Sequence, residues 1–246
     1  MLAPMEALIY FFGAAGISDF LMNTLMIKRL KLMEDDYLPG TLVANCLVPC
    51  SIFSFSLLRK GDSVDTLTLL SCAVAIAIGS YMGSRLVNKI DGAKIKKVML
   101  FALIVSFVIL VIKMIISEGV SGTASSLGGA KLIFAVVCCF VTGLINMFGI
   151  PMKPTWTALF LILGLSPIST LTMVQSVGYF GPLSGGFNII RSGKYHQKTA
   201  LCAAVFGTIG AIIGVTVALS ISSGMLNIIL LLVMALAIFS MAKPSK

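Results

Sequence analysis

The chain has 246 residues, of which 58% are hydrophobic and only 11% are charged, and its formal net charge is +9 at pH 7. So small a polar fraction cannot cover a water-soluble globule, which indicates a protein whose solvent is lipid. Lys and Arg lie mostly at the ends of apolar runs, where basic residues set membrane topology, so we expect no nucleic-acid partner despite the positive charge.

Apolar runs long enough to cross the hydrocarbon layer, roughly 20 residues each, recur along almost the whole chain. Backbone groups in lipid must be satisfied within helices. We therefore predict an all-α integral membrane protein, a polytopic helical bundle of about eight transmembrane segments, with residues 1–246 as a single membrane domain. The first run lacks the basic start of a cleaved signal peptide and is expected to stay in the mature protein. In chain order, the predicted helices are 7–26, 38–58, 66–86, 98–116, 132–150, a short 155–165, 167–190, 200–220 and 225–241.

Three features recur in the same order at a spacing of roughly 130 residues, which predicts an internal repeat. They are a proline inside an apolar helix, a basic residue and a glycine at the end of that helix, and a pair of glycines four residues apart. The glycine pairs should allow close helix approach, and the pair Gly79 and Gly83 should tolerate Ala but not Leu. We predict two pseudo-symmetric repeats, 1–116 and 131–246, joined by a linker at 117–130 rich in Ser and Gly. The matching residues are Pro49 and Pro182, Arg59-Lys60-Gly61 and Arg191-Ser192-Gly193, and Gly79 with Gly83 against Gly210 with Gly214.

The basic connections do not fit a simple alternation of full crossings, because one crossing for each long run places them on both sides of the membrane. A broken or re-entrant segment is expected around 149–154, where the chain has two prolines and a lysine. Such a segment would change the number of membrane crossings from odd to even or the reverse (the parity), and so invert one half relative to the other. Parallel halves that obey the positive-inside rule poorly are the alternative.

The first segment of each half is interrupted, at Gly13 to Asp19 and at Gly149 to Trp156, and we predict a broken or re-entrant helix at both places. Interrupted helices at corresponding positions indicate a transporter site, and their free N-termini attract anions. Lys153 adds positive charge, whereas Asp19 is the candidate coupling or proton site. Each would cost on the order of 3 kcal/mol in the apolar layer unless paired or hydrated.

Further polar side chains on the helices that follow the interruptions would line a cavity between the halves. The structural alternatives are that Lys153 snorkels from a helix end, that Asp19 caps a helix, and that the other side chains only join helices. The candidate substrate-binding residues are Lys153, Asn23, Thr41, Asn45, Asn146, Trp156, Gln175 and Ser176.

The six cysteines lie in apolar runs without a CxxC pair, and His196 is the sole histidine, so we expect no metal site and no cofactor.

No phosphate-binding GxxxxGK[ST] loop is present, which favours an ion gradient over nucleotide as the energy source. The nine acidic residues are scattered, and an integral membrane enzyme is therefore the weakest alternative. A channel-like or scaffold membrane subunit is the other alternative, and the oligomeric state, including a homo-oligomer, stays open.

The stretch from Gly40-Thr41 to Gly61, together with 77–86 and the basic run that ends at Lys97, resembles the sulfite exporter TauE/SafE family over nearly the full length of the chain. The resemblance implies a multi-pass permease of the cytoplasmic membrane that moves sulfite, an organosulfonate or a related small anion by alternating access. The family usually has a glycine-rich turn followed by proline where this chain has Gly16-Ile17-Ser18-Asp19 and Gly149 to Pro154. The departure bears on the substrate more than on the fold.

Overall fold

The computed structural model describes residues 2–59, 64–87, 101, 104, 105, 108, 112 and 123–218. Within these residues the secondary structure is helical, apart from turns and one isolated bridge between Ala124 and Leu165. The all-α prediction is confirmed for this part of the chain. The predicted helix 225–241 and most of 98–116 lie outside it. In chain order, the helices are α1 (Leu2–Gly13), α2 (Asp19–Leu30), the 3-10 turn η1 (Asp35–Tyr37), α3 (Leu38–Leu58), α4 (Thr66–Val87), α6 (Gly129–Asn146), α7 (Lys153–Ile162), α8 (Pro167–Ser192), α9 (Gln197–Cys202), the π-helical turn η2 (Ala203–Gly207) and α10 (Thr208–Ala218).

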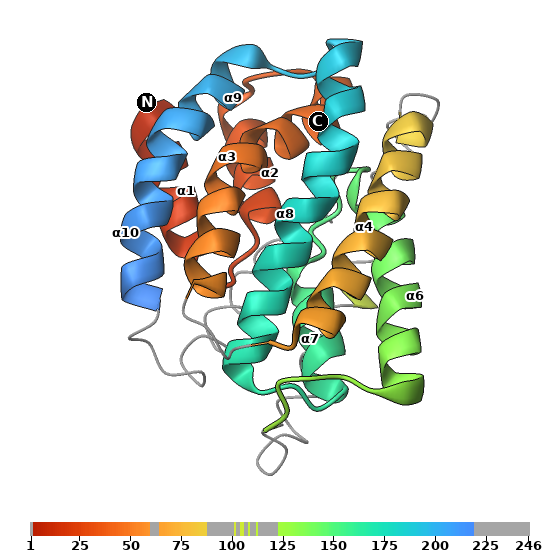
Figure 1. Ribbon diagram of the computed structural model, residues 1–246. Coiled ribbons are helices and arrows are strands. Elements are labelled where there is room, and N and C mark those ends of the chain that lie inside the picture. The colour runs from red at the N-terminus through yellow and green to blue at the C-terminus, as the bar shows by residue number, and fades with distance from the viewer. Residues whose placement is uncertain are drawn as a thin grey trace.

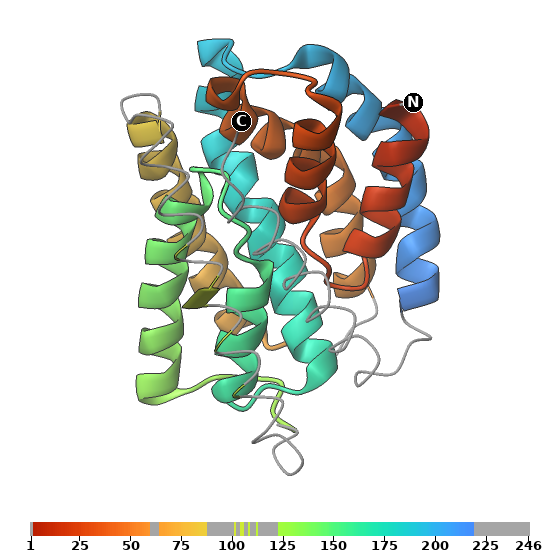
Figure 2. The ribbon, with the colours of Figure 1, turned by 180° about the vertical axis from the view of Figure 1, so that it is seen from behind.

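The helices α3 and α8 pack together at the centre of the bundle, with α4 and α6 on one side and α1 and α10 on the other (Figures 1 and 2). The central pair is antiparallel, because Ser54 near the end of α3 contacts Ser176 in α8, whereas Gly40 at the start of α3 lies against Ile189 near the end of α8. Each central helix contains a proline, Pro49 in α3 and Pro182 in α8.

The first predicted segment, 7–26, is two helices rather than one, and the chain folds back on itself between them. α1 runs parallel to α3, since Glu6 contacts Asn45 and Gly13 lies against Phe53. α2 returns along α3, with Asp19 beside Cys50. The hairpin α1–α2 thus enters and leaves at the end of the bundle where α3 begins.

A second hairpin, α6–α7, enters from the opposite end. The predicted helix 132–150 ends at Asn146, and the chain turns back into α7 at Lys153. α7 finishes next to the start of α6, where Gly164 lies beside Lys131. Both predicted interruptions are therefore present as helix breaks, one in each half.

Close approach of α4 and α6 depends on the first glycine pair. A Cβ atom on Gly79 would overlap the backbone carbonyl of Phe140, and one on Gly83 would overlap that of Leu144. The expected close packing is confirmed. The expectation that alanine is tolerated is wrong, because even a methyl group would meet backbone atoms of the facing helix.

The second glycine pair packs α10 against α1 in the same way. A Cβ on Gly210 would overlap the carbonyl of Ala7, and one on Gly214 would overlap that of Phe11. The glycine-bearing helix of each predicted half, α4 or α10, thus packs against the first helix of the other predicted half, α6 or α1. This exchange, together with the antiparallel central pair, is the arrangement that inverted repeats require; the repeat itself stays a prediction.

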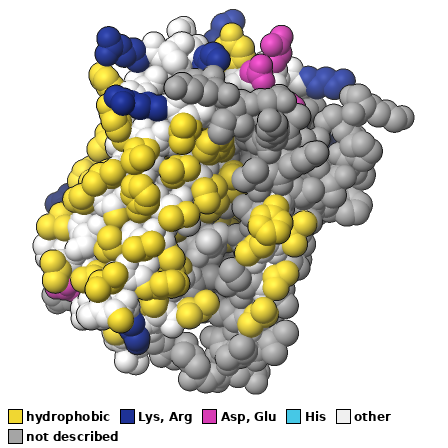
Figure 3. All heavy atoms as spheres, turned by 90° about the vertical axis from the view of Figure 1, so that its right-hand side faces the viewer, with side chains coloured by type: hydrophobic (Ala, Val, Ile, Leu, Met, Phe, Trp, Pro, Cys, Tyr) yellow, Lys and Arg dark blue, Asp and Glu magenta, His cyan; other side chains and the backbone are white. Residues whose placement is uncertain are grey.

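Four helices within the described part of the chain are long and apolar enough to cross a membrane: Asp35–Leu58, Thr66–Val87, Gly129–Asn146 and Gln197–Val217. Apolar side chains cover the described surface of α4 and α6, with Lys and Arg toward its ends (Figure 3). The chain is an integral membrane protein. The exposed apolar residues on these two helices include Leu67, Leu70, Val74, Ile78, Ile133, Phe134, Val137 and Val141.

Most described basic residues gather at one end of the bundle. The start of α3 meets the start of α9 there through Thr41 and His196, and the ends of α4 and α8 meet through Ser84 and Asn188. Each hairpin begins and ends at the same end of the bundle, which is the arrangement that the predicted change of parity requires; the membrane topology itself stays a prediction. The basic residues at this end are Lys28, Arg29, Lys31, Arg85, Arg191, Lys194 and Lys198, against Arg59 and Lys131 at the other end.

Candidate functional site

Each helix break contains, three residues after the helix ends, a glycine in the left-handed region of backbone space. Gly16 has φ 90° and Gly149 has φ 77°, conformations that strain any residue with a Cβ atom. An isoleucine that is almost fully buried follows each glycine, Ile17 in the first break and Ile150 in the second. The same sequence spacing separates the two glycines as separates Pro49 from Pro182. The two breaks therefore share both local conformation and position.

The first residues of the two returning helices meet in an ion pair. Lys153 Nζ, at the start of α7, lies 2.8 Å from Asp19 Oδ1, at the start of α2. Lys153 is 4% exposed and Asp19 is 2% exposed, so the alternative of a lysine snorkelling to the surface is excluded. The pair lies about halfway along the central helices, next to Cys50 of α3 and Gly178 of α8.

The surroundings of Lys153 favour a negative ligand. Asp19 stands in the first turn of α2, after the Ser18 cap, where the helix dipole stabilises a carboxylate. The first turn of α7 has no acidic residue and no side-chain cap, so Lys153 adds a cation to a positive helix end. Its ammonium lies 5.0 Å from the centre of the Phe53 ring, a cation–π distance.

Lys153 Nζ has one carboxylate oxygen beside it among the described residues, Asp19 Oδ1 at 2.8 Å. An ammonium carries three N–H donors, and this contact uses one of them, so the others can donate to a further acceptor. Two helix N-termini and one lysine face a single carboxylate. The arrangement can accept an anion beside Asp19 or in its place.

The central helices supply the remaining contacts around the pair. Cys50 donates its S–H to Asp19 Oδ2 at 3.6 Å, and Ser54 donates to Ser176 Oγ at 3.3 Å. Gln175 Nε2 donates to the carbonyls of Gly13 and Ala14 at 2.9 and 3.2 Å. Gln175 thereby satisfies the carboxyl end of α1, while its own Oε1 has no described partner.

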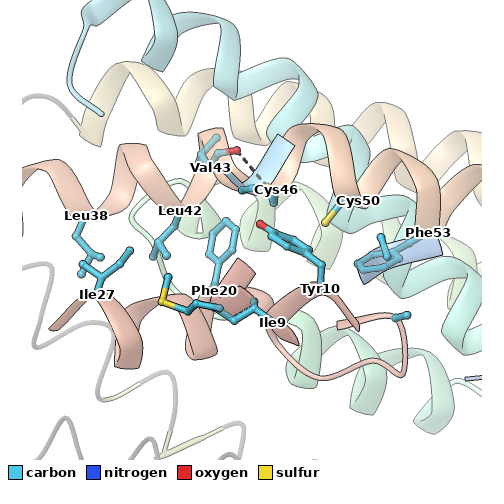
Figure 4. Packing of buried hydrophobic residues seen from close by; sticks show 14 of the residues in the cluster. Ile9, Tyr10, Phe20, Ile27, Leu38, Leu42, Val43, Cys46, Cys50 and Phe53 are labelled. Carbon is cyan, nitrogen blue, oxygen red and sulfur yellow. Dashed lines mark hydrogen bonds between the residues drawn. The ribbon is translucent and has the colours of Figure 1, made fainter. Parts of the chain in front are cut away.

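The predicted residues Asn23 and Asn45 belong to a second polar group next to the ion pair. Asn45 Nδ2 donates to Asn23 Oδ1 and to Glu6 Oε1, both at 3.2 Å. Figure 4 shows Tyr10 reaching from α1 to the face of α3 that carries Cys46 and Cys50. Glu6 was missed because the first helix was predicted to begin at residue 7; its place four residues before Tyr10 on one helix face was the available signal.

Trp156 lies beside the ion pair, and Asn146 lies where the second break begins. The indole N–H of Trp156 donates to Thr142 Oγ1 at 2.9 Å, and its ring approaches Gly178 next to Lys153. Asn146 is the last residue of α6 and is 3% exposed. Both residues therefore lie at the second break, as their positions in the sequence predicted.

No described contact joins Thr41 to the ion pair. Its hydroxyl donates to the Tyr37 carbonyl at 2.7 Å and accepts from the His196 backbone N–H at 2.9 Å. Thr41 thus fastens the start of α3 to the start of α9. Its hydrogen-bonding capacity is used by this structural role.

The described residues contain one group of potential metal ligands, Asp19 with Cys46 and Cys50, whose ligand atoms lie within 4.8 Å of one another. The ammonium Nζ of Lys153 already pairs with Asp19 Oδ1 at 2.8 Å, and its positive charge would repel a metal cation there. We assign no metal to this group.

The model of one protein family, Sulfite exporter TauE/SafE, matches residues 37–241. The chain belongs to the sulfite exporter TauE/SafE family. The match covers every described element from α3 onward, including Lys153, and begins after the α1–α2 hairpin that carries Glu6 and Asp19. No curated protein and no solved structure matches this TauE/SafE chain. Membership makes it a membrane protein of an anion exporter family.

Proposed function

We propose that this TauE/SafE family member is a secondary transporter that moves a small sulfur-containing anion, such as sulfite or an organosulfonate, across the cytoplasmic membrane. The observation that carries the proposal is the Lys153–Asp19 ion pair, buried where the N-termini of the returning helices α2 and α7 meet. A buried ion pair is costly to form, and such pairs inside a membrane are found along substrate pathways.

The anion would compete with Asp19 for Lys153. An oxyanion entering between the helix ends gains the ammonium of Lys153 and the positive end of the α7 helix dipole, and it releases the Asp19 carboxylate from its ion pair. The hydroxyls of Ser54 and Ser176 lie on the central helices at the same level and supply further donors. These groups suit a small tetrahedral or pyramidal oxyanion better than a neutral solute.

Alternating access would follow from the two hairpins. We propose that residues 1–116 and 131–246 are inverted repeats joined by the linker 117–130, and that each hairpin closes the path from its own side. The antiparallel course of α3 and α8 supports inversion over parallel halves. The substrate would meet the ion pair from one face and leave by the other as the hairpins shift.

Uptake into proteoliposomes tests the proposal. Radiolabelled sulfite, thiosulfate and a taurine-like sulfonate are supplied to vesicles containing the wild-type protein, and we expect saturable uptake of at least one of them. Lys153→Ala should abolish that uptake, and the control Lys131→Ala, at an exposed lysine, should not. Flux that does not saturate would indicate a channel, and folded protein without flux of any of these anions would favour a scaffold subunit.

A further inference from the structure

Glu6 is a second acid in the apolar layer, and no described residue supplies a cation to balance it. Its side chain is fully buried; α1 packs against α2, η2 and α10, and Glu6 reaches α3 through Asn45. The described residues form two ion pairs, Lys28 with Asp35 and Lys153 with Asp19, and Glu6 belongs to neither. A carboxylate buried without a cation costs several kcal/mol, so this position favours the neutral acid.

The groups that face Glu6 from neighbouring elements do not supply a positive charge. They are Tyr10 of α1, Asn23 and Asp19 of α2, and Asn45 of α3; Cys46 and Cys50 of α3 lie next to Tyr10, and Lys153 is already paired with Asp19. From His196 to Ala218, the stretch holding α9, η2 and α10, the charged side chain is that of Lys198, which is exposed. Asp19 makes a negative charge on Glu6 still less favourable.

The hydrogen bonds around Glu6 are incomplete in a way that one proton would repair. Asn45 Nδ2 donates to Glu6 Oε1 at 3.2 Å, yet Glu6 Oε2 and Asn45 Oδ1, both buried, have no partner among the described residues. Both unpartnered atoms are acceptors when Glu6 is ionised. A proton on Oε2 turns it into a donor for Oδ1 of the same Asn45, which closes a two-bond acid–amide ring.

We propose that Glu6 is the proton-binding site of this protein, with Asn45 as the residue that holds the protonated acid in place. Asp19, the acid expected from the sequence, instead forms the ion pair at the substrate site. Glu6 holds the proton while α1 and α3 are in contact and releases it when they separate, which couples proton movement to the movement of the first hairpin. The coupling role rests on the proposed transport function; proton binding does not.

Infrared spectroscopy of the detergent-solubilised protein tests proton binding without any substrate. Wild type at neutral pH should show the C=O stretch of a buried, protonated carboxylic acid, and Glu6→Gln should lack it. The control Glu34→Gln, which removes an exposed acid from the turn before α3, should keep the band. A spectrum of Glu6→Gln identical to wild type in this region would overturn the proposal.

Transport of radiolabelled sulfite in proteoliposomes tests coupling. An anion that moves with one proton is accumulated about tenfold by a tenfold proton gradient. Glu6→Gln presents an amide N–H to Asn45 Oδ1 just as the protonated acid would, so it should fold and still exchange sulfite across the membrane. It should lose accumulation driven by the gradient, whereas Glu34→Gln should retain both.

Two results would contradict the coupling role: gradient-driven accumulation by folded Glu6→Gln equal to wild type, or loss of exchange together with accumulation, which would place Glu6 in the substrate path. Absence of sulfite transport by wild type itself would count against the proposed function for this anion. The infrared measurement would still decide whether Glu6 binds a proton.

Discussion

Lys153 and Asp19 stabilise each other's charge, and neither side chain would stay charged at this depth without the other. Each is at least 95% buried, and taking an ion out of water costs several kcal/mol before any partner is considered. The attraction between them offsets that cost only while both are present. Substitution of either residue therefore acts on the stability of the fold as well as on the site, which the sequence alone did not indicate.

Lys153→Ala should weaken anion binding by about 1–3 kcal/mol, the range for hydrogen bonds to charged groups. It should also destabilise the protein by roughly 3–5 kcal/mol, because Asp19 is left as an unpaired buried charge. The double variant Asp19→Asn/Lys153→Met should recover most of the stability and none of the binding. Binding isotherms and thermal unfolding in detergent separate the two effects. Wild-type affinity in the folded double variant would remove Lys153 from the site.

Asp19→Asn should have the opposite effect on affinity. It removes the carboxylate that competes with the substrate for Lys153 and leaves a buried ammonium without a counter-ion. Added sulfite should therefore raise the melting temperature of Asp19→Asn more than that of wild type, because ligand binding to the folded state stabilises it. An equal or smaller shift would show that the anion does not take the place of the carboxylate.

At the scale of elements, backbone contact between helices explains why small residues stand where they do. α10 meets α1 through Gly210 and Gly214, and α4 meets α6 through Gly79 and Gly83. These contacts hold the outer arm of each hairpin, whereas the breaks leave the inner arms, α2 and α7, near the ion pair. Each hairpin is thus anchored on one arm, and its other arm supplies one residue of the ion pair.

Gly210→Ala should destabilise the protein by about 1–3 kcal/mol, the usual cost of forcing extra carbon into a close-packed contact. The added methyl group would meet the carbonyl of Ala7. Gly128→Ala is the matched control, since a Cβ there meets nothing within 4 Å and its φ of −126° suits any residue. Midpoints of thermal unfolding provide the comparison; equal midpoints for the two variants would mean that α10 and α1 are not in backbone contact.

At the scale of the whole molecule, the two ends of α8 should lie on opposite faces of the membrane. Its 26 residues extend about 39 Å, enough to cross a hydrocarbon layer of about 30 Å. Lys131 lies next to the start of α8 and Lys194 follows its end. The basic end, with Lys194, is expected to face the cytoplasm.

Cysteine labelling with an impermeant reagent tests this topology in intact cells, in a background in which the half-exposed Cys138 and Cys202 are replaced by Ala. Lys131→Cys should react from outside and Lys194→Cys only after permeabilisation. Lys96, which lies outside the described residues, should behave like Lys194, because α4 ends beside the end of α8. Reaction of Lys96→Cys and Lys194→Cys from opposite faces would reject inverted halves.

The sequence by itself was sufficient to predict that this protein lies in lipid and that it is all-helical. It also predicted where the helices break and which family the chain belongs to. These features depend on local composition: the length of apolar runs, the prolines, and the glycines Gly16 and Gly149 that allow a left-handed turn. Local signals of this kind need no knowledge of which segments meet. They also placed Lys153 and Asp19 at the breaks.

Only the tertiary structure decided what those residues contact. Contacts between segments distant in sequence bring Lys153 to Asp19 and Glu6 to Asn45. The same is true of the hydrogen bond from the His196 backbone N–H to Thr41, which joins the start of α3 to the start of α9. Composition cannot distinguish a helix that crosses the membrane from one arm of a hairpin, because both are apolar. The direction of each hairpin arm is set instead by its contacts with the central helices α3 and α8. Nor does an apolar pattern reveal whether a glycine faces lipid or backbone, since that depends on the helix packed against it.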